Sequence, residues 1–185
     1  MTDNLSPEKC INYIHQEALS AIYSGVFSPF DTISKKQLEF LKIQAINSVT
    51  NKKALLSNLK EQVSLATTKL ANQTGEYHKE ILKNFDVFNE KMKKAEQENQ
   101  DKTEEELKVI LDSICQENKK TTDSAYAWHI KGRDEILTTI RELFRDTKGC
   151  YDAIEEILSA YSKNVEKTFE IKLNLDLSFM QLGNN

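Results

Sequence analysis

The stretch QLEFLKIQAINSVTNKKALLSNLKEQVSLATTKL, residues 37–70, decides the fold of this chain. Its apolar residues recur at steps of three and four, which is the spacing of one face of an α-helix. A near-heptad stripe of this kind predicts a long helix that pairs with another helix in a coiled-coil-like way. Ser48 and Lys52 are the weak layers of this stripe. The predicted stripe consists of Leu38, Leu41, Ala45, Ser48, Lys52, Leu55, Leu59, Val63, Ala66 and Leu70. Gln73 is a further weak layer, and Thr74-Gly75 beside it is either a short break or a tolerated mid-helix glycine. The stripe then resumes at Tyr77, Ile81, Phe85, Phe88, Met92 and Ala95.

The chain uses very few residues that interrupt helices. It has five glycines and two prolines in 185 residues, and no proline follows Pro29. Average usage would be about 7% glycine and about 5% proline. Because intrinsic propensity alone does not stabilise a long helix, the apolar stripes are expected to be buried against partner helices.

Residues typical of helix starts, helix ends and turns predict the order of the elements. Ser6 and Pro7 are typical of a helix start, and Gly25 of its end. Residues 96–102 contain no apolar side chain, and Thr103 with Glu106 has the spacing of a capping box. We therefore predict a hairpin turn near 96–103, with one uninterrupted helix as the alternative.

A second stripe runs from Leu107 to Phe169, with a thin and partly polar middle at 118–132 and a possible break at Lys148-Gly149. The predicted fold is all-α, an elongated antiparallel long-helix bundle with a short N-terminal helix. The expected organisation is an N-terminal helix and aromatic connector in 1–30, a long-helix hairpin in 31–170, and a tail in 171–185.

The tail departs from the helical pattern. Leu173, Leu175, Leu177 and Phe179 alternate with polar residues, which is the period of a β-strand. A lone strand would need a partner strand from a second copy or from another protein. The alternative is a frayed helix end.

Composition and charge limit the class of protein. The chain is 39% hydrophobic and 29% charged, with a net charge of −4 and lysines interleaved with glutamates. This balance argues against a nucleic-acid binder. The N-terminus lacks the apolar run of a signal peptide, and no stretch has the roughly 18 apolar residues of a membrane span. Three cysteines without a CxxC pair argue against a disulfide framework. We expect a soluble, cytoplasmic protein.

Motifs of catalytic and metal sites are missing from the sequence. It contains no glycine-rich phosphate loop, no HExxH and no ExxH pair. A Cys–His pair could come only from Cys10 with His15, or from Cys115 with His129. Buried thiols are the favoured interpretation of the cysteines, and His15 and His78 are expected in solvent. The sequence predicts no catalytic residue, no cofactor and no metal.

Three groups of residues are candidates for binding a surface or a partner. The first is the aromatic entry with Phe27, Phe30, Phe40 and Leu41, which either docks the first helix on the second or forms an exposed apolar edge. The second is Trp128, favoured as a core residue and alternatively an interface anchor. The third is the tail, with Leu173, Leu175, Leu177 and Phe179.

Residues 26–66 resemble the opening helix of phasins, the helical proteins that coat bacterial polyhydroxyalkanoate granules. An aromatic-proline entry is followed by a Leu-Glu-x-Leu cadence, here Leu38-Glu39-Phe40-Leu41. The resemblance implies helices that pack on one another in solution and reopen to lay their apolar stripe on an apolar surface.

Two functions remain as expectations. The first is a non-catalytic amphipathic coat on an apolar granule or lipid surface. The alternative is an oligomeric coiled-coil adaptor, chaperone or effector that binds a protein through its helical face or its tail. A membrane-curving helical dimer and an enzyme rank below these. Under the first two readings we expect a homo-oligomer.

Overall fold

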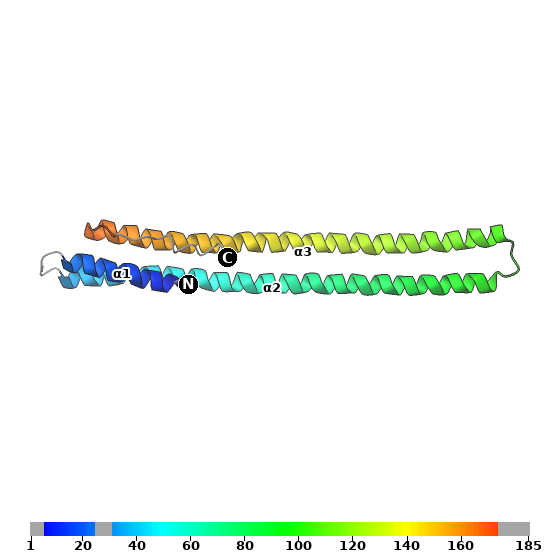
Figure 1. The fold of residues 1–185 in the computed structure, drawn as a ribbon, viewed down its shortest axis with the longest axis horizontal. Coiled ribbons are helices and arrows are strands. Elements are labelled where there is room, and N and C mark those ends of the chain that lie inside the picture. The colour runs from blue at the N-terminus through cyan, green and yellow to red at the C-terminus, as the bar shows by residue number, and fades with distance from the viewer. Residues whose placement is uncertain (1–5, 25–30, 174–185) are drawn as a thin grey trace, which may run out of the picture. The chain divides into compact units, whose positions relative to one another are not determined.

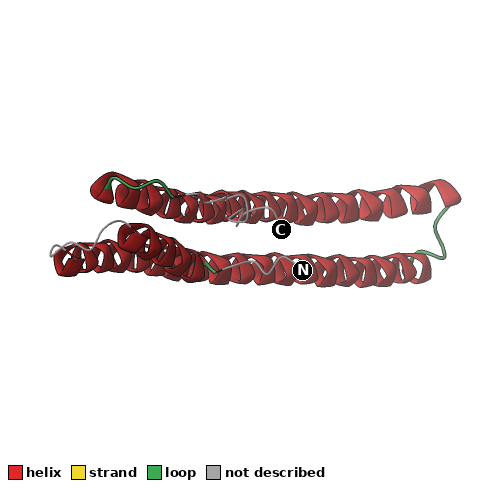
Figure 2. Ribbon diagram, turned by 60° about the vertical axis from the view of Figure 1, so that its left-hand side comes forward, coloured by secondary structure: helices red, strands yellow, loops and turns green. Residues whose placement is uncertain are grey.

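The computed structural model describes residues 6–24 and 31–173, and these residues form three α-helices (Figures 1 and 2). Helix α1 spans Pro7–Ser24, α2 spans Asp31–Glu98 and α3 spans Glu104–Phe169. The described part of the chain contains no strand. The all-α class is therefore confirmed. Of the candidate residues, Phe27, Phe30, Leu175, Leu177 and Phe179 lie outside the described residues.

The contacts divide the chain into two units, and both long helices contribute to each of them. Unit 1 combines Met1–Gln62 with Leu143–Asn185, and unit 2 is Val63–Glu142. Gly75 and Gly149, which were possible breaks, both lie inside continuous helices. Mid-helix glycine is tolerated here at its usual cost of about 1 kcal/mol.

Unit 1 is built around a core to which all three helices contribute. Helix α1 lies beside the N-terminal part of α2 (Figure 1). It begins at Pro7, and the hydroxyl of Ser6 accepts a hydrogen bond from the N–H of Lys9 at 3.4 Å, as the predicted cap requires. The buried core consists of Cys10, Ile11, Ile14, Ala18, Leu38, Ala45, Val49, Ile154, Leu158, Tyr161, Val165 and Leu173.

The buried stripe of α2 in unit 1 differs from the predicted one by a phase shift. Val49 is 0% exposed and Leu56 8%, whereas the predicted Ser48 is exposed and Leu55 is 47% exposed. The prediction that Ser48 forms a weak layer of the buried stripe is therefore wrong. The physical reason is that α2 packs against both α1 and α3 here, so its inward direction lies between two neighbours.

Unit 2 is a pair of antiparallel helices joined by a turn. Helix α2 ends at Glu98 and α3 begins at Glu104, so the connecting residues 99–103 lie inside the range predicted for a turn. The N–H of Thr103 donates to Glu106 Oε2 at 3.0 Å, and the N–H of Glu106 donates to Thr103 Oγ1 at 3.3 Å. This is the reciprocal capping box. The backbone and side-chain hydrogen bonds from Thr103 also lower the pKa of the Glu106 carboxyl.

Helix α3 ends in a left-handed residue. Glu170 has φ of 51°, and the N–H of Ile171 donates to the carbonyl of Glu166 at 3.1 Å, which is a Schellman-type ending. The N–H of Leu173 donates to Glu166 Oε1 at 2.8 Å. Residues 171–173 lie in neither a helix nor a strand, and the rest of the predicted tail lies outside the described residues. Burial of Leu173 in the core explains why the chain turns here.

Replacing the cap residue tests whether the turn is specified locally. Thr103→Ala removes the acceptor for the N–H of Glu106 and one donor to its carboxylate, so we expect a loss of about 1 kcal/mol in the free energy of unfolding. Urea titration followed by circular dichroism measures it. Thr68→Ala is the control, because Thr68 is an exposed mid-helix residue bonded only to its own helix. Equal effects of the two substitutions would contradict the capping role.

Candidate interaction surface

The structure separates the described candidate residues. Phe40 is 61% exposed on α2, and Leu41 beside it is half-buried against the core of unit 1. Leu173 is buried in that same core. Trp128 belongs to unit 2 and is 56% exposed. The interpretation of Trp128 as a core residue is therefore wrong, and Leu173 is a packing residue rather than a surface one.

An open apolar groove lies on unit 1 around Phe40. It is about 420 Å³ in volume. Ile33 lies one heptad, or about two helical turns, before Phe40. It is 56% exposed and was not selected from the sequence. Its seven-residue spacing from Phe40 is the signal that could have found it. The groove is lined by Ile33, Lys36, Gln37, Phe40, Leu41 and Thr168.

The seam between α2 and α3 in unit 2 is only half covered. Among the described residues of this unit, Ala95 and Ile136 are the only buried apolar side chains. An amphipathic helix usually carries an apolar stripe at least about 100° wide. A single partner helix covers less than that width. The following seam residues are therefore only partly buried: Val63, Ala66, Leu70, Tyr77, Ile81, Phe88, Met92, Leu107, Ile110, Leu111, Ile114, Ala125, Ile130 and Ile140.

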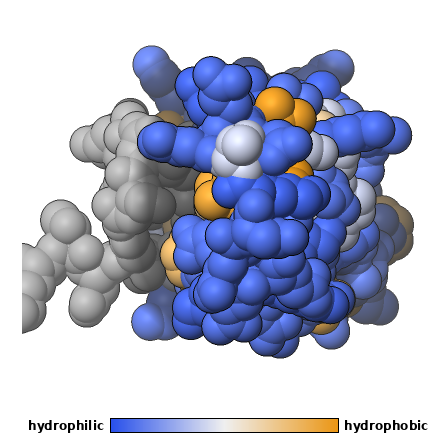
Figure 3. Space-filling view, turned by 90° about the vertical axis from the view of Figure 1, so that its right-hand side faces the viewer, coloured by the Kyte–Doolittle hydropathy of each residue, from blue (hydrophilic) through white to orange (hydrophobic). Residues whose placement is uncertain are grey.

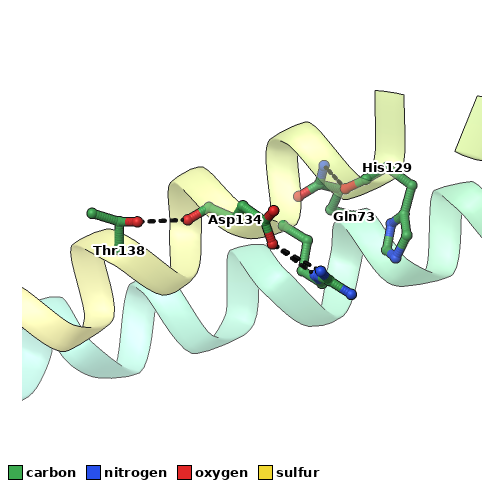
Figure 4. A network of polar contacts seen from close by, with 5 residues as sticks. Gln73, His129, Asp134 and Thr138 are labelled. Atoms are coloured by element: carbon green, nitrogen blue, oxygen red, sulfur yellow. Dashed lines mark hydrogen bonds and ion pairs between the residues drawn. The ribbon is translucent and has the colours of Figure 1, made fainter. Parts of the chain in front are cut away.

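A polar layer interrupts this seam at Gln73. The side-chain amide of Gln73 on α2 donates to the backbone carbonyl of His129 on α3 at 3.5 Å (Figure 4). The space that Gln73 occupies exists because residue 132 is glycine, since a Cβ at Gly132 would overlap the Gln73 amide. The sequence indicated a weak layer at Gln73, but not its partner on α3.

Aromatic rings flank the polar layer. The rings of Tyr77 and His129 are stacked with centroids 4.3 Å apart, and Tyr126 lies 6.5 Å from Tyr77 in a tilted arrangement. His129 therefore takes the inward position, and its neighbour Trp128 is left on the outside. Periodicity alone could not decide between these adjacent residues.

Three polar atoms within the unit 2 seam have no hydrogen-bond partner among the described residues. Gln73 Oε1, Asn84 Nδ2 and His129 Nδ1 are buried atoms without a partner among the described residues. Asn84 is half-buried, whereas the predicted stripe residue Phe85 is 58% exposed. The prediction that Phe85 lies in the seam is wrong, because α3 takes the face of α2 on the Asn84 side.

Charged residues connect the helices of unit 2 and cover its end. Lys91 Nζ on α2 lies 2.7 Å from Glu117 Oε1 on α3. The face that carries the α2–α3 turn is mainly hydrophilic (Figure 3). The exposed apolar side chains of unit 2 lie along its helices instead: Leu65, Leu82, Phe85, Val87, Val109, Tyr126 and Trp128.

Three further observations concern chemistry. The described residues contain no group of three His, Cys, Asp or Glu side chains placed to hold a metal ion. Cys10 and Cys150 are buried, as expected of structural thiols, whereas Cys115 is exposed. No described helix combines the length and the hydropathy needed to cross a membrane.

Comparisons of the chain with protein-family models, with curated proteins and with solved structures give no match.

Substitution of the glycines tests the polar layer of unit 2. Gly75→Ala should raise the free energy of unfolding by about 1 kcal/mol, because alanine favours the helix. Apart from the adjacent backbone of α2, no described atom lies within 4 Å of the added carbon. Gly132→Ala should gain less or lose stability, because it displaces the Gln73 amide and its hydrogen bond. Thermal and urea unfolding measure both variants. A gain at Gly132 equal to that at Gly75 would show that the layer contributes nothing.

Proposed function

We propose that this protein is a non-catalytic amphipathic helical protein that coats an apolar surface, in the manner of phasins on polyester granules, and that unit 2 makes the contact. The observation that carries the proposal is the half-covered seam of unit 2. As part of this proposal we place the protein in the cytoplasm, because its three cysteines lack the spacing of a disulfide framework.

Opening of unit 2 would expose little apolar area that is now fully buried, and it would make the apolar seam available to an apolar surface. Among the described residues, its helices bury only two apolar side chains, each still 7% exposed, whereas unit 1 has a core drawn from three helices. Laying the partly covered seam on an apolar phase would remove further apolar area from water, at about 25 cal/mol per Å². Amphipathic helices bind interfaces by this term. Unit 1 would remain folded while unit 2 opens.

The polar residues of the seam are compatible with this mechanism. Gln73, Asn84 and His129 each carry a buried atom without a hydrogen-bond partner in the described part of the chain, so opening would hydrate these atoms. Buried unsatisfied polar groups cost about 1–3 kcal/mol each, which lowers the cost of opening unit 2.

A second candidate function is association with other helices, as a homo-oligomer or as an adaptor for a protein. The polar layer supports it, because the fit between Gln73 and Gly132 fixes a register and a flat apolar surface does not require one. In this case coiled-coil-like pairing of the long helices extends to a further helix, which covers the seam of unit 2 instead of an apolar phase.

Flotation of the full-length protein with polyester or oil particles and with anionic liposomes separates these functions. The proposed coat should float with the apolar particles. The variant Ile81→Ser with Phe88→Ser should lower the bound fraction severalfold, because it removes two partly buried apolar side chains of the unit 2 seam. The matched control is Ile33→Ser with Phe40→Ser on unit 1, which should bind as the unchanged protein does.

Light scattering of the protein without particles supplies the other outcome. A stable oligomer that does not float would overturn the coat and support helical association. Loss of flotation in the unit 1 variant alone would move the contact from the seam of unit 2 to the groove around Phe40.

A further inference from the structure

Helix α1 covers an apolar face in unit 1. Ile11, Ile14 and Ala18 are at most 1% exposed and pack in one cluster with residues of α2 and α3. Leu38 and Leu158, on the other two helices, are 0% exposed in the same cluster. Departure of α1 would therefore uncover an apolar face on α2 and α3.

A histidine lies in this interface, against the sequence expectation that it would be in solvent. His15 on α1 is 6% exposed, and its Nε2 is 3.4 Å from Glu39 Oε2 on α2. Its other ring nitrogen, Nδ1, is buried and has no hydrogen-bond partner among the described residues. The expectation was wrong because spacing along α1 does not show which helix packs on it.

The geometry around His15 fits the neutral ring. A neutral imidazole carries one N–H, which Nε2 can direct to Glu39, and one bare nitrogen at Nδ1. Protonation adds a second N–H at Nδ1, where no described acceptor meets it. A buried donor without an acceptor is costly, so the charged ring is disfavoured in the docked state.

The charged and titratable groups around His15, taken together with its burial, also favour the neutral ring. Burial lowers the pKa of His15, the positive charge of Lys42 on α2 lowers it further, and Glu39 offsets them only in part. From α3, Tyr161 brings a buried hydroxyl into the same core, and burial followed by the charge of Glu39 raises its pKa. Tyr161 therefore remains uncharged when His15 titrates.

We propose that protonation of His15 undocks α1 from unit 1, so that α1 is an acid-released cover over the apolar face of α2 and α3. In the undocked state the ring returns to its ordinary pKa of about 6.5. Because the docked value is lower, docking is fully stabilised above pH 6.5 and is weakened as the pH falls below it. The inference does not depend on the proposed coat function.

An ion pair at the start of α1 adds a second step at lower pH. Lys53 Nζ on α2 lies 2.7 Å from Glu8 Oε1, and this hydrogen bond lowers the pKa of Glu8. The contribution is present above the ordinary glutamate value of about 4.3 and is lost below it. The window between pH 6.5 and 5 therefore isolates His15 from Glu8.

The reactivity of Cys10 in the full chain reports on docking. Cys10 lies on α1 and is 2% exposed, Cys150 is 5% exposed on α3, and Cys115 is exposed in unit 2. Labelling with dithiodipyridine, read by peptide mass spectrometry as the ratio of Cys10 to Cys115, corrects for the pH dependence of the reagent. From pH 7.5 to 5.5 we expect this ratio to rise up to about tenfold, since linkage at pKa 6.5 allows that shift.

Variants identify the group responsible. His15→Gln should remove the rise, whereas His78→Gln, at an exposed position of α2, should keep it. A flat ratio in the unchanged protein, or the full rise in His15→Gln, would overturn the proposal. So would a parallel rise at Cys150, which would show opening of all of unit 1.

A second measurement covers the case in which His15→Gln does not dock α1 even at pH 7.5. Hydrogen exchange of the unchanged protein, corrected for intrinsic rates, should then show faster exchange at pH 5.5 in α1 but not in residues 150–165. Unchanged protection of α1 would overturn the proposal.

Discussion

The number of helices that meet around an apolar stripe is the constraint on which the rest of this structure depends. A helix buries only the part of its surface that neighbours cover. In unit 1, α1 adds a third helix, and side chains such as Ile14, Val49 and Leu158 reach 0–1% exposure. In unit 2 two helices meet, and similar residues remain half-exposed. The same kind of sequence thus gives a well-covered core in one unit and an incomplete seam in the other.

The two units suit different tasks. Unit 1 has a core of large, tightly buried side chains, and its covering helix carries the one buried histidine among the described residues. Unit 2 carries unsatisfied polar atoms and exposed aromatic side chains. Regions with few buried apolar contacts open at the lowest free energy. A protein that must remain folded and still present an apolar face can combine the two.

Much of the fold follows from local sequence signals, and much of the candidate surface does not. The Ser6 cap and the Thr103–Glu106 capping box each act within one turn of helix, and the proline-free stripe repeats at steps of three and four residues. These signals are local, so the sequence predicts them. The burial of Leu56 in place of Leu55 depends on a third helix, which a periodic pattern does not contain. The same holds for His15, which α1 buries against α2, and for the choice of His129 over Trp128 as the inward residue. The left-handed Glu170 was also missed, because glycine rather than glutamate is the usual residue in that conformation.

Hydrogen–deuterium exchange of the intact chain at pH 7.5 tests the central claim, that the seam of unit 2 opens before the core of unit 1. Residues 38–59 and 150–165 represent unit 1, and residues 66–95 and 107–140 represent unit 2, within the same two helices. The account predicts that unit 2 exchanges at least about tenfold faster after correction for intrinsic rates, as its lower burial requires. Equal protection along both helices would contradict it.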